Sequence, residues 1–381
     1  MGKVAEAPIG FTMLTRLQVK GFKNLADVDV SFGPFTCVAG TNGVGKSNLF
    51  DAITFLAATA DLSLIEADRR VRDEQSRSNR IQSLFFRAGD EIVDEIFLVA
   101  DMLIPSEGLD ELGQPAHASC TFLRYTLVLG HETTPGIQHS ERLIVKREEL
   151  TYIKKQGASK ELLFAHSDDW LDSVVTGQRK SPFISTVEDA GVVTIRLHQD
   201  GNQGRPRNLL AANLPRTVLS SANAVESPTA LLAKQEMQSW RLLQLEPSAL
   251  RNSDAFNAPT HIGADGSNMA ATLYHLARSS SNPNDDEAAV YVRVANRVSQ
   301  LVQDIRSIGV DVDERRELLT LQVTTRDSTL HPARALSDGT LRFLALAILE
   351  EDSSAQGLLC LEEPENGIHP ERIPVHPVHP V

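Results

Sequence analysis

Alternating hydrophobic and polar residues near the start of the chain predict two strands joined by a turn. Leu17 and Val19 alternate with polar residues until Gly21 breaks the run, and a second strand is expected at Val28–Phe32. The next apolar block, Phe35–Ala39, is short and partly β-branched and ends in a glycine-rich turn. This pattern predicts a buried strand that leads into a loop.

A helix is predicted directly after this loop. Leu49, Ile53, Leu56 and Ala60 recur at intervals of three or four residues, so they share one face of a helix. The predicted order over residues 35–60 is therefore strand, glycine-rich loop and helix.

The middle of the chain carries shorter patterns. Glu95–Ile104 predicts a strand, and short β-like runs follow between Gly, Pro, Asn and Asp residues, which predicts a β-rich insertion. The runs are Thr121–Leu129, Arg142–Val145, Glu149–Ile153 and Val192–Leu197. Helical spacing then returns at Pro228–Leu245, Met269–Ala277 and Asp286–Ile305. No heptad pattern lasts long enough to predict a coiled-coil arm.

Two strands, at Gly309–Val312 and Leu318–Thr324, precede the last informative segment. That segment combines a predicted helix, Leu341–Glu350, with the apolar run Gly357–Leu361, which is typical of a central parallel strand. The patterns divide the chain into residues 13–104, an N-terminal lobe; 105–305, a β-rich and then helical insertion; 306–373, a C-terminal lobe; and 374–381, a tail of Pro and His that resembles a truncated end. The predicted fold class is α/β.

The charge balance limits the partners. The 381 residues include 37 Lys and Arg against 50 Asp and Glu, a formal charge of −13, so the chain is not a constitutive nucleic-acid coat. Contact with DNA would need a local basic patch. The best candidates are Arg69, Arg70, Arg72, Arg77, Arg80 and Arg87. Asp68, Asp73 and Glu74 dilute this patch, so a solvated helix or loop is the favoured interpretation.

The number of cysteines and the length of the apolar runs predict the cellular compartment of the protein. Three scattered cysteines are too few for a disulfide framework or a zinc site, and no apolar run approaches the roughly 20 residues of a spanning helix. We therefore expect a cytoplasmic protein with no membrane partner.

One motif predicts a nucleotide site. The segment Gly40–Ser47 matches G-x-x-x-x-G-K-[ST] and lies between a predicted strand and a predicted helix, as this motif requires. Glycines let backbone amides surround a phosphate, the lysine reaches the β and γ oxygens, and the serine hydroxyl binds magnesium. The alternative is a fortuitous glycine turn. The predicted nucleotide-binding residues are Gly40, Thr41, Asn42, Gly43, Val44, Gly45, Lys46, Ser47 and Asn48.

Two further segments carry candidate chemistry. Glu362 and Glu363 follow the apolar run near the C-terminus, where Glu362 could hold magnesium and Glu363 could act as general base; a solvated acidic turn is the alternative. Upstream, Leu336–Thr340 offers a hydroxyl, a glycine and a helix start. These features suit a second anion site, although an N-capped helix explains the fragment alone better. The pair Lys23–Asn24 could touch a nucleotide base, but a polar turn is favoured.

Together these segments resemble the ABC-type P-loop ATPase heads of the SMC, RecF and OLD-like group, with an AAA-type core and no long coiled coil. The residues that carry the resemblance are Leu17–Leu25, Gly40–Asn48, Asp51–Ile53, Leu336–Phe343 and Leu358–Pro370. The matches lie at the two ends of the chain, and the middle resembles the group only loosely.

The resemblance implies a cofactor, a partner and roles for residues. Its members bind ATP with Mg²⁺ between two heads, which suggests a homodimer in which the Ser337, Asp338 and Gly339 signature of one head faces the nucleotide of the other. It also implies that Glu363 is the catalytic base and that Ser47 and Glu362 serve the metal. The sequence departs from the group at Glu362, where an aspartate is usual, and at Asp338 and Thr340, which fit RecF and OLD members better than transporters.

The functional expectations follow from this resemblance. The leading expectation is an ATPase that acts as a dimerising switch in DNA repair, genome maintenance or phage defence, with DNA and a nuclease as possible partners. The alternative is a nucleotide-binding scaffold that regulates a partner without efficient hydrolysis. The His-Pro-Val tail favours the alternative, because relatives continue there with strands and a switch histidine, whereas His369, His376 and His379 fit an extended proline-rich tail better than metal ligands.

Overall fold

The computed structural model describes residues 11–71, 81–133, 141–201, 204–279, 287–302, 304–352 and 357–363. These residues belong to two compact units, Met1–Trp240 and Arg241–Val381. The units divide at Trp240, inside the stretch that the sequence patterns assigned to one insertion. The division of the chain into two lobes, an insertion and a tail stays a prediction.

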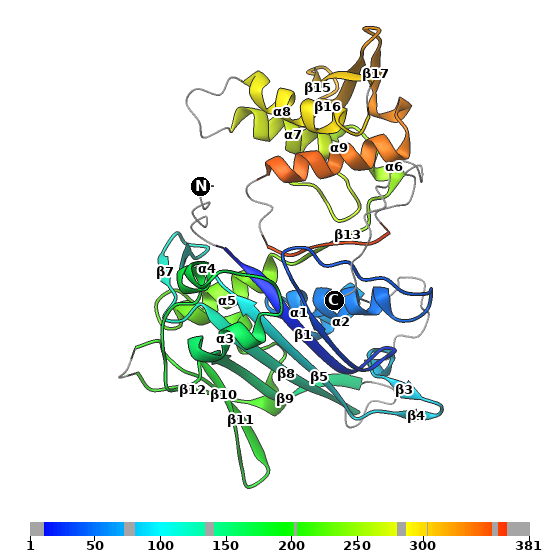
Figure 1. Ribbon diagram of the computed structural model, residues 1–381. Coiled ribbons are helices and arrows are strands. Elements are labelled where there is room, and N and C mark those ends of the chain that lie inside the picture. Colours follow the sequence, from blue (N-terminus) through cyan, green and yellow to red (C-terminus); the bar gives the residue numbers. More distant parts are fainter. Residues whose placement is uncertain are drawn as a thin grey trace. The chain divides into compact units, whose positions relative to one another are not determined.

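Unit 1 is built on an eight-stranded antiparallel sheet in the order β12-β11-β10-β9-β8-β5-β1-β2 (Figure 1). The strands are β1 (Met13–Phe22), β2 (Leu25–Ser31), β5 (Glu95–Leu103), β8 (Phe122–Thr133), β9 (Glu141–Tyr152), β10 (Ile184–Asp189), β11 (Val192–Leu197) and β12 (Arg207–Leu210). Two small hairpins join β3 (Arg87–Ala88) to β4 (Glu91–Ile92) and β6 (Glu107–Leu109) to β7 (Pro115–His117).

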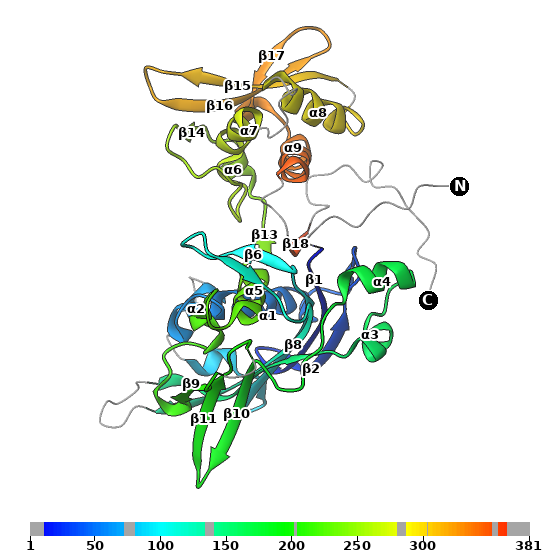
Figure 2. The same cartoon turned by 90° about the vertical axis from the view of Figure 1, so that its left-hand side faces the viewer.

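Helices cover both faces of this sheet. The helices α1 (Lys46–Thr59), α2 (Leu64–Val71) and α5 (Pro228–Gln238) lie on one face, and α3 (Lys155–Glu161) and α4 (Asp168–Val174) lie on the other (Figures 1 and 2). Short 3-10 turns form η1 (Ile81–Leu84), η2 (Ala211–Asn213) and η3 (Leu219–Ser221). The alternation in β1 explains the layering, since Leu17 and Val19 are fully buried whereas Arg16 and Lys20 are only partly covered.

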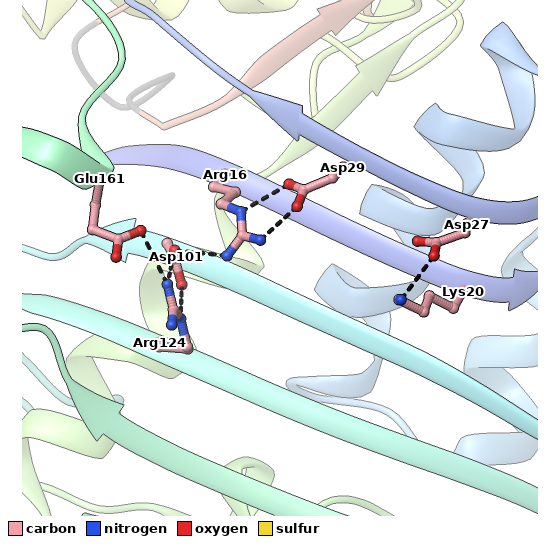
Figure 3. Close-up of polar contacts among 7 residues, drawn as sticks. All are labelled: Arg16, Lys20, Asp27, Asp29, Asp101, Arg124 and Glu161. Carbon is pink, nitrogen blue, oxygen red and sulfur yellow. Dashed lines mark hydrogen bonds and ion pairs between the residues drawn. The ribbon is translucent and has the colours of Figure 1, made fainter.

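The face that carries α3 and α4 holds a chain of ion pairs across four strands (Figure 3). Arg16 pairs with Asp29 on β2 at 2.5 Å and approaches Asp101 on β5 at 3.7 Å. Arg124 on β8 pairs with the buried Asp101 at 2.6 Å and with Glu161 of α3 at 3.3 Å. The Asp29 hydrogen bond raises the pKa of Arg16, and Asp101 likewise raises that of Arg124, so both remain cations. These ion pairs fix the register of the strands β2, β1, β5 and β8.

A buried carboxylate ties β9 to η3. Glu148 accepts hydrogen bonds from the backbone amides of Val218 at 2.7 Å and Leu219 at 2.8 Å, and from the Tyr125 hydroxyl at 3.2 Å. Burial raises the pKa of Glu148 to about 7, and these donors oppose that rise. The start of η3 is therefore satisfied by a side chain from the sheet.

Unit 2 combines a two-stranded parallel ladder with a helical layer over a small antiparallel sheet. The ladder pairs β13 (Arg241–Leu243) with β18 (Leu359–Leu361), and the sheet holds β14 (Asp254–Ala255), β15 (Ile305–Asp313), β16 (Leu318–Thr325) and β17 (Leu330–Pro332). The remaining elements are α6 (Pro247–Leu250), α7 (Met269–Arg278), α8 (Glu287–Ser299), η4 (Ala333–Ala335) and α9 (Asp338–Glu351). Leu321 and Val323 of β16 share one core with Leu344 and Ile348 of α9.

Most predicted elements are confirmed within a few residues. The helix predicted after the glycine-rich loop is α1, and Leu49, Ile53, Leu56 and Ala60 are all buried. The strand predicted at Glu95–Ile104 is β5. The two runs predicted at Arg142–Val145 and Glu149–Ile153 are one strand, β9, whose pairing with β8 shifts at Val128.

Four predictions were wrong. The run Gly357–Leu361 contains the parallel strand β18, but this strand is not central, because its ladder has only two strands among the described residues. Phe35–Ala39 forms no strand and is largely exposed, with Phe35 90% accessible, because no strand in the described part of the chain hydrogen-bonds to it. The helix predicted to reach Leu245 ends at Gln238, because Arg241–Leu243 pairs with β18 instead. The helix predicted to reach Ile305 ends at Ser299, since Ile305 opens β15.

Candidate functional site

The glycine-rich loop of unit 1 joins β2 to α1. Gly43 and Gly45 adopt positive φ values of 82° and 109°, which let the chain reverse in front of the helix. Gly45 is the N-cap of α1, and no side chain caps the helix there. Thr41, Asn42, Gly43 and Val44 are exposed. This arrangement leaves the positive end of the α1 dipole facing solvent, as an anion site requires.

Lys46 closes the loop on itself. Its ammonium donates hydrogen bonds to the carbonyl oxygens of Gly40 at 2.7 Å and Thr41 at 3.0 Å. The cation therefore spans the mouth of the loop.

The β1–β2 turn supports the loop from behind. Asn48 of α1 donates a 2.6 Å hydrogen bond to the Asn24 side chain, which in turn lies 3.5 Å from the Gly43 carbonyl oxygen. Lys23 pairs with Asp51 of α1 at 2.5 Å and donates to the Val71 carbonyl at the end of α2 at 2.6 Å. The sequence favoured a polar turn here, and the structure confirms it.

The paired acids of unit 2 follow β18. The Glu362 amide donates to the Leu243 carbonyl at 3.2 Å, and the Gln244 side-chain amide donates to the Glu362 carboxylate. Glu363 has a left-handed backbone, φ 47°, and its carbonyl accepts from Arg342 of α9 at 3.1 Å. The ladder with β13 thus presents both acids beside α9, and a small hollow there is lined by Leu243, Leu245, Arg342, Leu346, Leu361 and Glu362.

The signature segment begins α9. The Ser337 hydroxyl caps the helix by accepting from the Thr340 amide at 3.3 Å, and it also lies 2.9 Å from the Thr340 hydroxyl. Asp338 pairs with Arg251, which also donates to the Leu336 carbonyl at 3.2 Å. Gly339 is buried. The segment therefore has the capped helix start that the sequence favoured for it, and its nucleotide role stays a prediction.

Within each unit the predicted site residues gather around one helix. Gly40, Lys46, Ser47 and Asn48 surround the start of α1, whereas Glu363 is joined to α9 through Arg342. Ser47 and Glu362 supply oxygen donors of the kind that Mg²⁺ prefers. The convergence of the two sets on one nucleotide stays a prediction.

Sequence patterns missed the supporting residues. Asn24 and Asp51 hold the loop in unit 1, and Arg251, Gln244 and Arg342 hold the signature and the acids in unit 2. Asn24 lies in a predicted turn, and Asp51 and Arg342 lie in segments that carry the resemblance, but no pattern predicted their contacts. These contacts join residues 21 to 118 positions apart.

The candidate DNA patch is only partly described. Arg69 and Arg70, in the last turn of α2, and Arg87 are exposed, whereas Asp68 is buried. Arg72, Arg77, Arg80, Asp73 and Glu74 lie outside the described residues, as do His369, His376 and His379. A DNA contact at this patch stays a prediction.

The described residues offer neither a ready-made metal site nor a membrane-spanning helix. No group of three His, Cys, Asp or Glu side chains gathers there as a ready metal cage. No helix in the same residues is both long and apolar enough to cross a bilayer.

Comparison with known proteins matches both ends of the chain. Residues 16–99 match the family described as "AAA domain", and residues 212–374 match "AAA domain, putative AbiEii toxin, Type IV TA system". An OLD nuclease of Thermus scotoductus is 51% identical over 41 residues, 11% of this chain and 8% of that protein. The DNA replication and repair protein RecF of Bacteroides thetaiotaomicron is 31% identical over 86 residues, 22% of this chain and 23% of RecF. The matches therefore span less than a quarter of either curated relative.

A solved structure also aligns with most of the chain. It is an Smc head bound to the C-terminal winged-helix domain of ScpA, with a TM-score of 0.42 and 13% identity over 94% of this chain and 83% of that one. The glycine-rich loop and the sequence matches define the class, a P-loop ATPase. Within that class, the matches support the SMC, RecF and OLD group.

Proposed function

We propose that this chain binds ATP with Mg²⁺ and hydrolyses it as a switch that dimerises. The observation that carries the proposal is the start of α1, where a glycine loop precedes a helix with no side-chain cap and Lys46 lies across the mouth of the loop. Backbone amides and the helix dipole would bind the β-phosphate, and Lys46 would neutralise the β and γ oxygens.

The residues of unit 2 would supply the hydrolytic half of the site. Glu363 would accept a proton from the attacking water, and Ser47 and Glu362 would hold Mg²⁺, whose charge offsets that of the phosphates. Ser337, Asp338 and Gly339 of a second copy would contact the γ-phosphate. ATP would then favour the dimer, because those contacts exist only in the closed state.

The biological output that we propose is DNA repair, genome maintenance or phage defence, with DNA and a nuclease as partners. The names of the two curated relatives support it, a repair protein and a nuclease. A second candidate is a nucleotide-binding scaffold without efficient turnover. One observation favours it: the Ser337 hydroxyl is already engaged as a helix cap. Tight ATP binding without phosphate release would identify the scaffold.

Mixing two inactive variants tests the shared site. Lys46→Ala removes the loop cation and Ser337→Arg blocks the signature, so each alone should lose ATPase activity. A mixed dimer keeps one composite site with both halves intact, and we expect roughly a quarter to a half of wild-type activity to return in phosphate-release assays.

The control addresses the lost helix cap. Ser167 caps α4 by accepting from the Trp170 amide at 3.1 Å, so Ser167→Arg removes a comparable cap away from the signature and should remain active. If the mixture stays inactive while both variants still dimerise, the shared site is refuted.

A further inference from the structure

The turn between β1 and β2 is more elaborate than a simple reversal requires. Phe22 and Leu25 close the hairpin as directly paired residues, so two residues, Lys23 and Asn24, make the whole connection. Lys23 holds a left-handed backbone, φ 49°, and its amide donates to the Leu84 carbonyl at 2.7 Å. A lysine in this conformation stores strain that its contacts must offset.

Those contacts reach the helix behind the glycine loop. The Lys23 side chain is 19% exposed, and its ammonium pairs with Asp51 and also donates to the Val71 carbonyl. One side chain thereby joins the second turn of α1 to the end of α2. Both bonds are charge-assisted and partly shielded from water, which makes them stronger than exposed pairs.

Asn24 contacts the glycine loop at Gly43 and the start of α1 at Asn48. Its carbonyl oxygen accepts from Asn48, in the first turn of α1, and its amide lies at the long limit of hydrogen bonding from the Gly43 carbonyl. A Cβ on Gly45 would lie only 2.8 Å from the Asn24 oxygen and 3.0 Å from Leu25. The turn therefore packs directly against the backbone at the N-cap of α1.

We propose that Lys23 and Asn24 are positioning residues of the phosphate loop, which hold its backbone amides and the start of α1 in the geometry that an ATP phosphate needs. This inference rests on the proposed nucleotide site. In this role Lys23 and Asn24 act on the nucleotide site through the loop backbone, and neither side chain touches the nucleotide. Preorganisation of this kind increases affinity because the loop loses less conformational freedom on binding.

The test uses two measurements on the full chain with Asn24→Ala. In the ligand-free protein we expect amide hydrogen exchange in residues 40–49 to rise at least fivefold, while exchange in β5 stays unchanged. In calorimetry with MgATP we expect about tenfold weaker binding. The exchange measurement isolates positioning, because a residue that only touched the nucleotide would leave the ligand-free loop unaltered.

Lys20→Ala is the matched control. Lys20 lies on the same hairpin and pairs with Asp27 across it at 2.8 Å, with both side chains exposed (Figure 3). It should change neither measurement. Asn48→Ala removes the hydrogen bond to Asn24 from the other side, and the double variant should lose less affinity than the sum of the two single variants, because both changes remove that shared bond.

The outcomes separate this inference from the function on which it rests. Unchanged exchange in residues 40–49 of Asn24→Ala would overturn the positioning role, whatever the affinity. Absence of MgATP binding by the wild-type chain would instead refute the nucleotide site, and the exchange result would still decide whether the turn holds the loop.

Discussion

The starts of α1 and α9 differ in whether a side chain caps the first backbone amides of the helix. Both helices have 14 residues, and both begin in segments that the sequence linked to phosphate binding. α9 is capped by its own Ser337 and anchored through Asp338 to Arg251, whereas α1 begins at a left-handed glycine without a side-chain cap. Amides that already have a side-chain acceptor gain less from an anion. In the proposed function, the comparison therefore favours α1 over α9 as the primary phosphate site.

The largest expected effect concerns the glycine that opens α1. Gly45→Ala forces a Cβ against Asn24 and Leu25 at φ 109°, and we expect it to cost about 3 kcal/mol of unit 1 stability and to abolish MgATP binding. Gly43→Ala is the matched variant, because its φ is also positive but nothing lies within 4 Å of the added atom. It should cost only about 1 kcal/mol.

Tryptophan fluorescence measures this difference selectively. The chain has two tryptophans, Trp170 and Trp240, and both belong to unit 1. Denaturant unfolding followed by this signal therefore reports unit 1. Equal losses for the two glycine variants would show that the turn does not pack against the loop in solution.

The start of η3 extends the comparison, because we expect its contribution to stability to depend on pH. Its amides depend on Glu148, whose pKa is about 7 in the fold and 4.5 unperturbed. Because the folded value is the higher one, unfolding releases protons between these values, and stability falls as pH rises from about 5 to 7. The full effect is of the order of 3 kcal/mol, because each unit of pKa corresponds to about 1.4 kcal/mol.

Glu148→Gln should remove this pH dependence. It should also lower stability at pH 5.5 by about 1–3 kcal/mol, because the side-chain NH₂ would face a backbone N–H where the carboxyl accepts a hydrogen bond. Urea titrations at pH 5.5 and 8, followed by tryptophan fluorescence, check both effects. A variant with an unaltered pH slope would exclude Glu148 as the titrating group.

The smallest expected effect is the loss of a single cap. Ser337→Ala should cost about 1 kcal/mol in unit 2 and leave the tryptophan transition in place, whereas Ser167→Ala should move that transition by a similar amount. Circular dichroism records the loss in unit 2. A shift of the tryptophan signal by Ser337→Ala would mean that the two units unfold together.

Local patterns in the sequence predicted the elements whose signals are local. The spacing of Leu49, Ile53 and Leu56 predicted α1, and the glycines and Lys46 predicted the loop before it. Phe35–Ala39 shows the limit: its apolar, β-branched composition predicts a strand, but a strand also needs a partner, which composition cannot specify.

The residues that hold the candidate site in place could not be predicted from local sequence patterns, for the same reason. Asn24 meets Asn48 across 24 residues, and Gln244 meets Glu362 across 118. Helical and strand spacing operate over a few residues, so they carry no information about such pairs. The candidate ligands could be named from the motif, but the side chains that hold them required the fold.

The ladder of unit 2 has a consequence for synthesis of the protein. β13 opens this unit and β18 is its last described strand, so the two partners are separated by more than a hundred residues of chain. The strands and helices of unit 1 all lie before residue 241, and domains fold as units during translation, the N-terminal one first. Unit 1 can thus fold while the ribosome is still adding unit 2, and the acids that follow β18 take their positions only after β18 has been synthesised and can pair with β13.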